Sequence, residues 1–343
     1  MKICQFLASA GGGGLEKHTQ ELCNELAKTQ DVTLIAPAEM QQYLSKNVHF
    51  IPLNFNRSRY NPLLLWDLLK ILRKGNYDII HAQANKAASL LAMLQNYVPG
   101  CAIGTIHNSN ANKGRAFKNI PHVIAVSKEA ADRVAGGTQA SIVYNGVKNL
   151  TPDLSYTKEQ LCKQFGLENQ RPLLCAIGRL VSAKGFDLLI AALRDVDVNL
   201  LIVGDGPLKT ALQQQIECLA LKSRIVLTGY RNDVVDILNG VDGVVISSRN
   251  EGFSYVFAEA MLLNKPVIST DVPVANEFLA ADLLTDKNES SIANKIAEYA
   301  FNPQRWIEKM QPTFTATSGR FTLDAMTNDT LAVYQKVIAN KSN

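Results

Sequence analysis

The sequence predicts an α/β protein built from two doubly wound parallel sheets, and three observations support this prediction. The chain has 343 residues, which at about 150 residues per domain favours two domains. Short runs rich in Ile, Val and Leu alternate with amphipathic stretches along its length. These runs are continuously apolar, which is typical of parallel strands that helices cover on both faces.

The expected strands fall into two groups. In the first half they cover residues 2–7, 32–36, 79–82, 102–106, 123–126 and 142–144. In the second half they cover residues 173–177, 200–203, 225–227, 243–246 and 266–269. A mostly polar stretch between Lys148 and Arg171 marks the join, so we predict domains over 1–165 and 166–343. An amphipathic helix over 323–338 closes the chain and is expected to pack back on the first domain.

Composition and charge exclude several classes of protein. Hydrophobic residues make up 47% and charged residues 19% of the chain, so it can bury a core and is not disordered. A net charge of +4 is too small for a protein built to neutralise a nucleic acid, and no nucleic-acid partner is expected. Residues 1–159 carry 17 basic and 11 acidic side chains, whereas residues 160–343 carry 18 and 20. An anionic partner should therefore meet the first half.

The cysteines and apolar segments indicate a cytoplasmic protein. The six cysteines include no C-x-x-C pair, which favours reduced thiols over a disulfide or zinc framework. The apolar stretch near Met1 is too short for a secretory signal. No segment reaches the roughly 18 to 20 apolar residues that span a bilayer.

Residues that can carry chemistry gather directly after the expected strands, where open parallel sheets bind ligands. After the first strand, glycines at 11–14 open a helix, and their amides can approach a phosphate closely. The run matches neither G-x-G-x-x-G nor the Walker pattern. The alternative to a phosphate-binding loop is a flexible turn. After residues 173–177, Arg179 and Lys184 place two cations on one loop, which suits a diphosphate. The alternative is that Arg179 and Lys184 are solvated surface cations that bind no ligand.

A pair of carboxylates follows the strand at 243–246. Glu251 lies in the loop, and Glu259 lies a little over one turn into a helix that begins near Ser254, on the same face as Tyr255. The amides of residues 253–256 would then point at an anion. Carboxylates are poor phosphate ligands but accept hydrogen bonds from hydroxyl groups, so the predicted ligand is a nucleotide sugar.

The segment from Glu251 to Glu259 resembles the E-x7-E motif of retaining glycosyltransferases of family 4. Their fold, called GT-B, has two Rossmann-like domains facing across a cleft. Other pieces resemble the family in its order, namely GGLE at 13–16, TIH at 105–107, AVS at 125–127, YNGV at 144–147, the segment 178–185, VGDGP at 203–207 and PVI at 266–268. Each piece alone is degenerate, but seven in sequence are specific.

The resemblance implies roles for individual residues. Arg179 and Lys184 would hold the donor diphosphate and stabilise the departing nucleotide. Glu259 would accept hydrogen bonds from the ribose, and Glu251 would contact the sugar. His107 matches the family's histidine near the reacting sugar. The implied catalytic residues are His107, Arg179, Lys184 and Glu251, and the implied donor-binding residues are Gly13, Gly14, Arg179, Lys184, Tyr230, Arg231, Glu251, Gly252, Phe253, Ser254, Tyr255, Val256 and Glu259.

The resemblance also implies contacts from the first domain and with the base. Gly13 and Gly14 would close on the diphosphate from the opposite domain, and Tyr230 and Arg231 would contact the base. The chain departs from the commoner family pattern at Ser254, where glycine is frequent, so the choice of donor sugar stays open.

The resemblance implies a metal-independent retaining transferase without a cofactor. It would move a sugar from a nucleotide-diphosphate donor, expected to be a UDP-sugar, to a glycan or lipid-linked acceptor. No residue is nominated as a covalent nucleophile. In the mechanism that the resemblance implies, the acceptor attacks from the face that the nucleotide leaves. By family analogy the setting is bacterial lipopolysaccharide or envelope polysaccharide synthesis. The alternatives are an epimerase or phosphorylase of the same fold, and a non-catalytic nucleotide-sugar-binding scaffold.

Two further features have competing interpretations. Asp195 and Asp197 resemble the D-x-D metal site of the other main glycosyltransferase fold, but they precede a strand, which favours a surface turn. Basic clusters in the first domain are either solvated loops or a surface for anionic lipids at the inner face of the cytoplasmic membrane. These clusters comprise Arg57, Arg59, Lys113, Arg115 and Lys118, with Trp66 or Phe117 as the apolar contact.

Overall fold

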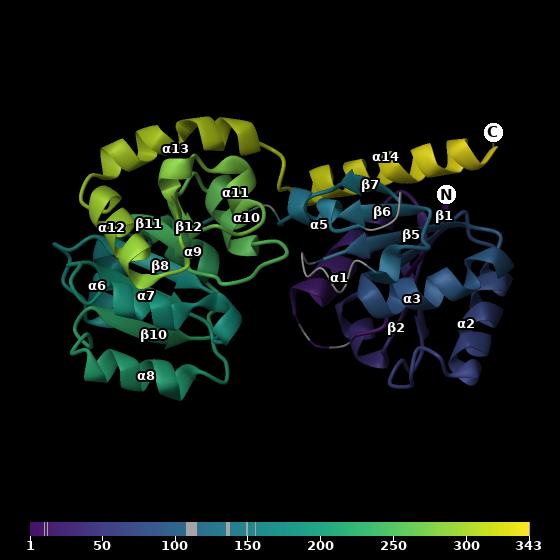
Figure 1. Ribbon diagram of the computed structural model, residues 1–343, viewed down its shortest axis with the longest axis horizontal. Coiled ribbons are helices and arrows are strands. Elements are labelled where there is room, and N and C mark those ends of the chain that lie inside the picture. Colours follow the sequence, from purple (N-terminus) through teal and green to yellow (C-terminus); the bar gives the residue numbers. More distant parts are fainter. Residues whose placement is uncertain are drawn as a thin grey trace. The chain divides into compact units, whose positions relative to one another are not determined.

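The computed structural model describes residues 1–9, 11, 13–107, 115–134, 138–148, 150–154 and 156–342. Contacts divide the chain into two units, one of Met1–Lys148 with Thr322–Asn343 and one of Asn149–Phe321. Each unit is built on a parallel sheet with helices packed against it, which confirms the two Rossmann-like sheets that the sequence predicts (Figure 1).

Within the described residues, the sheet of the first unit has seven strands in the order β3-β2-β1-β4-β5-β6-β7, and all neighbours are parallel. The strands are β1 (Lys2–Leu7), β2 (Asp31–Ala36), β3 (Val48–Pro52), β4 (Ile79–Gln83), β5 (Cys101–Ile106), β6 (His122–Ala125) and β7 (Gln139–Ile142). The helices are α1 (Gly14–Leu26), α2 (Pro62–Gly75), α3 (Ala84–Leu94), α5 (Lys128–Asp132) and α14 (Leu323–Ser342), with short 3-10 turns η1 (Ala38–Tyr43), η2 (Gln95–Tyr97) and η3 (Arg115–Phe117).

Helices cover both faces of this first sheet. On one face, Ile3 of β1 packs in a core with Leu22 of α1 and Tyr334 of α14. On the other face, Cys4 of β1 packs in a core with Leu68 of α2 and with α3. Since successive strand residues point to opposite faces, both must be apolar, and this explains the continuously apolar runs in the sequence.

The C-terminal helix α14, drawn in yellow in Figure 1, belongs to the first unit. Just before it, Thr322 pairs with Val147 in a parallel bridge, and the amide of Leu323 donates to the carbonyl oxygen of Val147 at 3.1 Å. A Cβ on Gly146 would lie 2.6 Å from the carbonyl oxygen of Thr322, so glycine permits this close approach. The helix is thereby fixed to the segment that follows β7.

The sheet of the second unit has the order β10-β9-β8-β11-β12-β13 in the part of the chain that the structure describes. Its strands are β8 (Leu173–Ile177), β9 (Asn199–Val203), β10 (Ile225–Gly229), β11 (Gly243–Ile246), β12 (Val267–Thr270) and β13 (Leu284–Thr285). Its helices are α6 (Lys158–Phe165), α7 (Phe186–Ala192), α8 (Lys209–Cys218), α9 (Val234–Gly240), α10 (Tyr255–Leu262), α11 (Ala275–Phe278), α12 (Glu289–Tyr299) and α13 (Pro303–Thr317), with 3-10 turns η4 (Ser182–Lys184) and η5 (Ala281–Leu283).

The division between the units falls after Lys148, whereas the sequence places a boundary near residue 165. The difference arises at α6, because Leu161 and Cys162 of this helix pack in a core with Leu173 of β8. The segment before residue 165 therefore contributes to the second unit.

Candidate active site

The loop after β8 carries both predicted cations and is held by close backbone contacts. Gly204, directly after β9, has a φ of +142°, and a Cβ there would lie 2.0 Å from the carbonyl oxygen of Gly178. The amide of Leu180 donates to the carbonyl oxygen of Asp205 at 2.9 Å. Because only glycine tolerates such an approach, the loops after β8 and β9 form one rigid platform at the carboxyl edge of the sheet.

Lys184 and Glu251 meet at this edge. The Lys184 Nζ lies 2.5 Å from Oε1 of Glu251, and the Ser248 hydroxyl donates to the same carboxylate oxygen at 2.7 Å. The side chain of Glu251 is 9% exposed and that of Lys184 is 23% exposed. The Ser247 hydroxyl donates to the carbonyl oxygen of Lys184 at 2.9 Å. The structure thus brings together two side chains that the sequence assigns to the diphosphate and to the sugar.

Helix α10 begins beside this ion pair. Ser254 is its N-cap, and the Ser254 hydroxyl oxygen accepts a hydrogen bond from the amide of Phe257 at 3.3 Å. A small hollow joins the ion pair to the start of the helix, and it is lined by Ile177, Lys184, Phe186, Val245, Ile246, Ser247, Ser248, Glu251, Ser254 and Val256. A cation, a carboxylate and a helix N-terminus therefore surround one point at the edge of the sheet.

The other predicted residues of this segment support the helix or follow it. The Phe253 ring is buried and lies edge-to-face against Tyr255, with ring centroids 5.4 Å apart, and against Phe321 at 6.0 Å. Gly252 and Glu259 are both half-buried, and Glu259 lies in the second turn of α10. Because the Phe253 ring is buried, this residue can contact a ligand only through its backbone.

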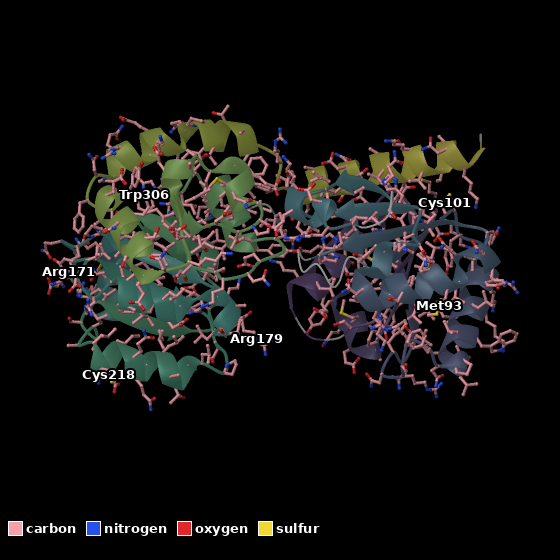
Figure 2. All side chains as sticks on the ribbon, in the orientation of Figure 1. Met93, Cys101, Arg171, Arg179, Cys218 and Trp306 are labelled. Atoms are coloured by element: carbon pink, nitrogen blue, oxygen red, sulfur yellow. The ribbon has the colours of Figure 1, made fainter. Side chains whose placement is uncertain are left out.

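Arg179 differs from Lys184 in having no partner. Its side chain is exposed and makes no hydrogen bond or ion pair to any residue that the structure describes. Figure 2 shows this side chain extending away from the ribbon of the second unit. An unpaired guanidinium beside the platform is available to an anionic ligand.

Arg249 and Asp187 tie the two loops of the site together, and sequence reasoning missed both. The Arg249 guanidinium donates to the two carboxylate oxygens of Asp187 at 2.7 and 2.6 Å, and to the carbonyl oxygen of Ser182 at 2.9 Å. These hydrogen bonds hold the pKa of Asp187 below its ordinary value. Asp187 lies two residues after Gly185 and Arg249 two before Glu251, so both adjoin a motif, but no spacing rule links them.

Tyr230 and Arg231 have different surroundings. Tyr230 is 76% exposed. The Nε of Arg231 donates to Asp233 at 2.8 Å, and its guanidinium lies 5.8 Å from the centre of the Phe165 ring. Arg231 is therefore held by structural contacts, and Tyr230 is the more available of the two predicted base contacts.

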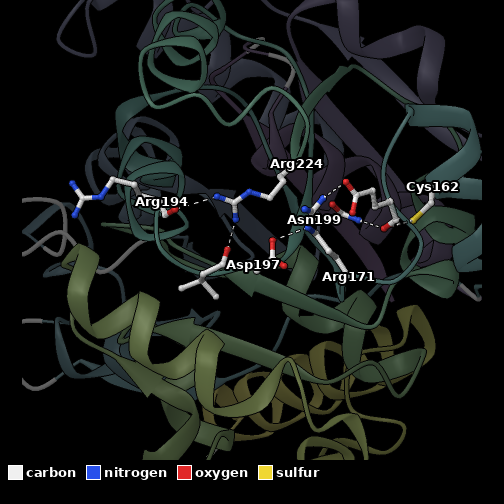
Figure 3. Close-up of polar contacts among 8 residues, drawn as sticks. Cys162, Arg171, Arg194, Asp197, Asn199 and Arg224 are labelled. Carbon is white, nitrogen blue, oxygen red and sulfur yellow. Dashed lines mark hydrogen bonds and ion pairs between the residues drawn. The ribbon is translucent and has the colours of Figure 1, made fainter.

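The D-x-D sequence lies before β9, at the amino edge of the second sheet. Asp197 accepts a hydrogen bond from Nε of Arg171 at 2.6 Å (Figure 3). Asp195 lies 3.1 Å from Nε of Arg194. Both carboxylates are thus paired with arginines. In the ranges that the structure describes, no cluster of three or more His, Cys, Asp or Glu side chains could hold a metal ion.

In the first unit, the glycine-rich loop folds around Glu16. The amides of Gly11 and Gly13 donate to its carboxylate at 2.8 and 2.9 Å, and the Ser9 hydroxyl donates at 2.6 Å. Burial opposes ionisation, but these hydrogen bonds hold the pKa of Glu16 below its ordinary value. Two amides that the sequence offers to a phosphate thus bind a carboxylate of the chain itself. Gly14 is the first residue of α1, and Gly12 lies outside the described residues.

His107 follows β5 and is held at one ring nitrogen. Its Nε2 lies 2.8 Å from Oε1 of Gln83, and its ring lies edge-to-face against His18 with centroids 4.7 Å apart. Burial, then the neighbouring His18 and His81, lower the pKa of His107 well below its ordinary value. His81 lies 2.6 Å from both the Tyr334 hydroxyl and the Thr105 hydroxyl, as expected of a structural histidine.

Two family models match the chain. Residues 12–148 match the model described as Glycosyltransferase Family 4, and residues 171–302 match the model described as Glycosyl transferases group 1. No helix among the described residues is long and apolar enough to cross a membrane.

Individual relatives support the same family. An uncharacterised glycosyltransferase of Methanocaldococcus jannaschii is 28% identical over 319 residues, covering 85% of this chain and 86% of the relative. The O-antigen biosynthesis glycosyltransferase WclY of Escherichia coli is 26% identical over 200 residues, covering 57% of this chain and 56% of the relative.

A solved structure shares the fold, and the sequence matches place the chain in a family. The structure of HepE from Anabaena in complex with UDP is 22% identical, with a TM-score of 0.84 over 98% of this chain and 100% of HepE. This likeness confirms the GT-B fold class, two parallel-sheet Rossmann-like domains. The two family models, which match both halves of the sequence, show that the chain belongs to glycosyltransferase family 4.

Proposed function

We propose that this glycosyltransferase moves a sugar from a nucleotide-diphosphate donor, a UDP-sugar, to a glycan or lipid-linked acceptor with retention of the anomeric configuration. The observation that carries the proposal is the hollow where Lys184, Glu251 and the start of α10 meet. A cation and a helix N-terminus suit phosphate oxygens, and a carboxylate suits sugar hydroxyls. The HepE structures with UDP and with UDP-glucose favour a uridine donor.

The ion pair suggests how the donor would use this site. Lys184 would turn from Glu251 to a diphosphate oxygen, and the freed Glu251 oxygen, still held by Ser248, would accept a hydroxyl hydrogen of the sugar. The exposed Arg179 would bind the same diphosphate through two hydrogen bonds. The amides at the start of α10 would add further donors for this anion, and Tyr230 would contact the base.

The chemical step we propose needs no covalent intermediate on the enzyme. The acceptor oxygen would form its bond to the anomeric carbon while the bond from that carbon to the diphosphate oxygen breaks. The acceptor proton would pass to the departing phosphate, whose charge Arg179 and Lys184 stabilise. Catalysis would then come mainly from fixed charges and positioning, with no metal ion or cofactor required. His107 would contact the transferred sugar.

The setting we propose is the synthesis of bacterial lipopolysaccharide or envelope polysaccharide. It is supported by the WclY relative, which is described as acting in O-antigen biosynthesis. The acceptor would then be a growing glycan or its lipid carrier.

A panel of nucleotide sugars tests the donor class through thermal stability. A donor present at about 100 times its dissociation constant stabilises the folded state by about 2.7 kcal/mol, which should raise the melting temperature by several degrees. We expect UDP and at least one UDP-sugar to produce this shift and GDP-sugars to produce none. If no nucleotide sugar of the panel stabilises the protein, the proposal is wrong.

We also propose that the first unit binds anionic lipid through α2 and the preceding loop. Leu63 is 60% exposed and Trp66 53% exposed, and Nζ of Lys70 lies 5.2 Å from the centre of the Trp66 ring. Arg57 and Arg59 are exposed beside them. Phe117, the other apolar contact considered from the sequence, is fully buried and is excluded. Lys113 lies outside the described residues.

Vesicle flotation tests this surface. We expect the protein to float with phosphatidylglycerol vesicles and to stay in solution with phosphatidylcholine vesicles, because basic side chains add electrostatic attraction to apolar contact. Trp66→Ser should weaken flotation several-fold. Tyr43→Ser, at an aromatic residue 54% exposed on η1, is the matched control and should leave flotation unchanged. Equal flotation with both lipids would contradict the proposal.

A further inference from the structure

The turn η4, which carries Lys184, takes its position from the segment that follows β11. The carbonyl oxygen of Ala183 accepts a hydrogen bond from the amide of Arg249 at 2.8 Å. The carbonyl oxygen of Ser182 accepts one from the Arg249 guanidinium at 2.9 Å. The carbonyl oxygen of Lys184 accepts one from the Ser247 hydroxyl at 2.9 Å. All three carbonyl oxygens of the turn thus bind this one segment, which thereby determines where the backbone of Lys184 lies.

Arg249 contributes to this contact through both its backbone and its side chain. Its amide binds Ala183, and its guanidinium binds Ser182 and both carboxylate oxygens of Asp187, in the first turn of α7. These partners lie before and after Lys184 in the sequence, so Arg249 holds the turn from two sides. The flat guanidinium fork can bind two groups at once in a fixed geometry, which the single ammonium of a lysine cannot do.

The direction of the Lys184 side chain follows from the position of the turn. A Cβ on Gly178 would lie 3.0 Å from Cε of Lys184 and 3.3 Å from Cδ, so the lysine stem runs along Gly178. Nζ then reaches Oε1 of Glu251. Glu251 is held separately, because Ser248 donates to its carboxylate and Thr270 donates to the carbonyl oxygen of Ser248 at 2.7 Å. A displaced turn would therefore move the cation away from a carboxylate that keeps its place.

Arg179 lies on the same loop but is placed by other contacts. The amide of Leu180 binds the carbonyl oxygen of Asp205 at 2.9 Å. A Cβ on Gly206 would lie 2.6 Å from the carbonyl oxygen of Leu180. The part of the loop that carries Arg179 thus rests on the segment after β9, whereas the part that carries Lys184 rests on the segment after β11.

We propose that Arg249, held by Asp187, is a positioning residue that determines where the Lys184 ammonium meets the diphosphate of the donor. This role rests on the proposed function and deepens it, because it gives one of the two cations a support of its own. Arg249 then acts through Lys184 and leaves Arg179 unaffected.

Titration of the full chain with UDP and with inorganic pyrophosphate, followed by nuclear magnetic resonance, tests this role. We expect Arg249→Met to raise both dissociation constants about tenfold, because the Lys184 ammonium is displaced from the phosphate oxygens. In a Lys184→Met background the same substitution should change them less than about twofold, since no ammonium is left to position. In an Arg179→Lys background it should keep its effect of about tenfold.

Two conservative variants test the same contact with less disturbance of folding. Arg249→Lys keeps the positive charge but loses the fork that binds Asp187 and Ser182 together, so it should raise both dissociation constants several-fold. Asp187→Asn keeps the shape of the partner, removes its charge and should act in the same direction. Both effects should disappear in the Lys184→Met background. Normal binding in both variants overturns the positioning role.

Arg171→Met is the matched control. Arg171 also joins two segments of the second unit, through Glu168 at 2.9 Å and Asp197 at 2.6 Å, but at the amino edge of the sheet. Its substitution should lower the melting temperature about as much as Arg249→Met does and leave both dissociation constants unchanged. Weakened UDP binding in Arg171→Met, or an effect of Arg249→Met that survives the removal of Lys184, would show that Arg249 only stabilises the fold, and would overturn the positioning role.

The outcomes also separate this role from the donor proposal. If UDP binds no more tightly than pyrophosphate, but pyrophosphate binding shows the expected dependence on Lys184, the donor class is wrong and the positioning role stands. If UDP binds more tightly and Arg249→Met leaves its dissociation constant unchanged, the donor class stands and the positioning role is wrong. If neither ligand binds, both are wrong.

Discussion

Replacing Arg179 with alanine should reduce kcat/KM for sugar transfer about 100- to 1,000-fold and leave the melting temperature of the protein unchanged. The side chain is exposed and has no partner among the described residues, so its removal breaks no contact of the folded state. Its proposed partner is the diphosphate, where negative charge develops as the nucleotide departs. Initial rates with the donor found in the panel, and thermal unfolding, measure the two effects.

Arg194→Ala is the matched control for this prediction. Arg194 is also an exposed arginine of the second unit, with its side chain 66% exposed, but it lies before β9 at the amino edge of the sheet. Its removal should change neither transfer nor stability. Near-normal turnover in both Arg179→Ala and Lys184→Ala would refute the assignment of the diphosphate site.

Lys184→Ala should lower the transfer rate to a similar extent, but with a loss of stability that Arg179→Ala does not show. Glu251 is almost buried, and removal of Lys184 would take away the cation whose Nζ lies 2.5 Å from its carboxylate, whereas the hydroxyl of Ser248 would remain. A nearly buried carboxylate that loses its paired cation should lower the free energy of unfolding by about 2 kcal/mol. The difference in stability between Lys184→Ala and Arg179→Ala distinguishes a paired cation from an unpaired one.

The interior strands were predictable from the sequence, whereas three of the four edge strands among the described residues were missed or misplaced. β1, β8 and β11 have the predicted bounds because both faces of each strand are buried, which requires a continuously apolar run. β3 and β13 were missed, and β7 begins three residues before the predicted strand. All three lie at the edges of their sheets. An edge strand such as β7 can be largely exposed, so its sequence need not be apolar.

The candidate site was predictable where its signal is local. The capped start of α10 and the positions of Glu251 and Lys184 on adjacent loops follow from the motif and from the rule that ligands bind at the carboxyl edge. Two ion pairs depend on how two loops pack, namely Lys184 with Glu251 and Arg249 with Asp187. The hydrophobic periodicity of a sequence does not indicate which loops contact each other. The inward turn of Glu16 was also missed, although it is local, because all three of its partners lie within seven residues of it.

Gly185→Ala should destabilise the protein and abolish transfer, because the backbone leaves no room for a side chain there. Gly185 ends the loop of the cations with a φ of +64°, and a Cβ would lie 2.1 Å from the carbonyl oxygen of Ser247. The left-handed conformation alone costs about 1 to 2 kcal/mol for a residue with a Cβ, and the clash adds to it. We expect the free energy of unfolding, measured by urea denaturation, to fall by at least about 3 kcal/mol.

Gly166→Ala isolates the conformational part of this effect. Gly166 follows α6 with a φ of +66°, and a Cβ there would meet no atom within 4 Å. Its substitution should therefore cost only about 1 to 2 kcal/mol and leave transfer intact. The difference between the two variants measures how tightly the loop carrying Lys184 packs on the loop carrying Glu251. Equal stability of the two variants, with normal transfer in both, would mean that these loops do not form the rigid platform on which the diphosphate site depends.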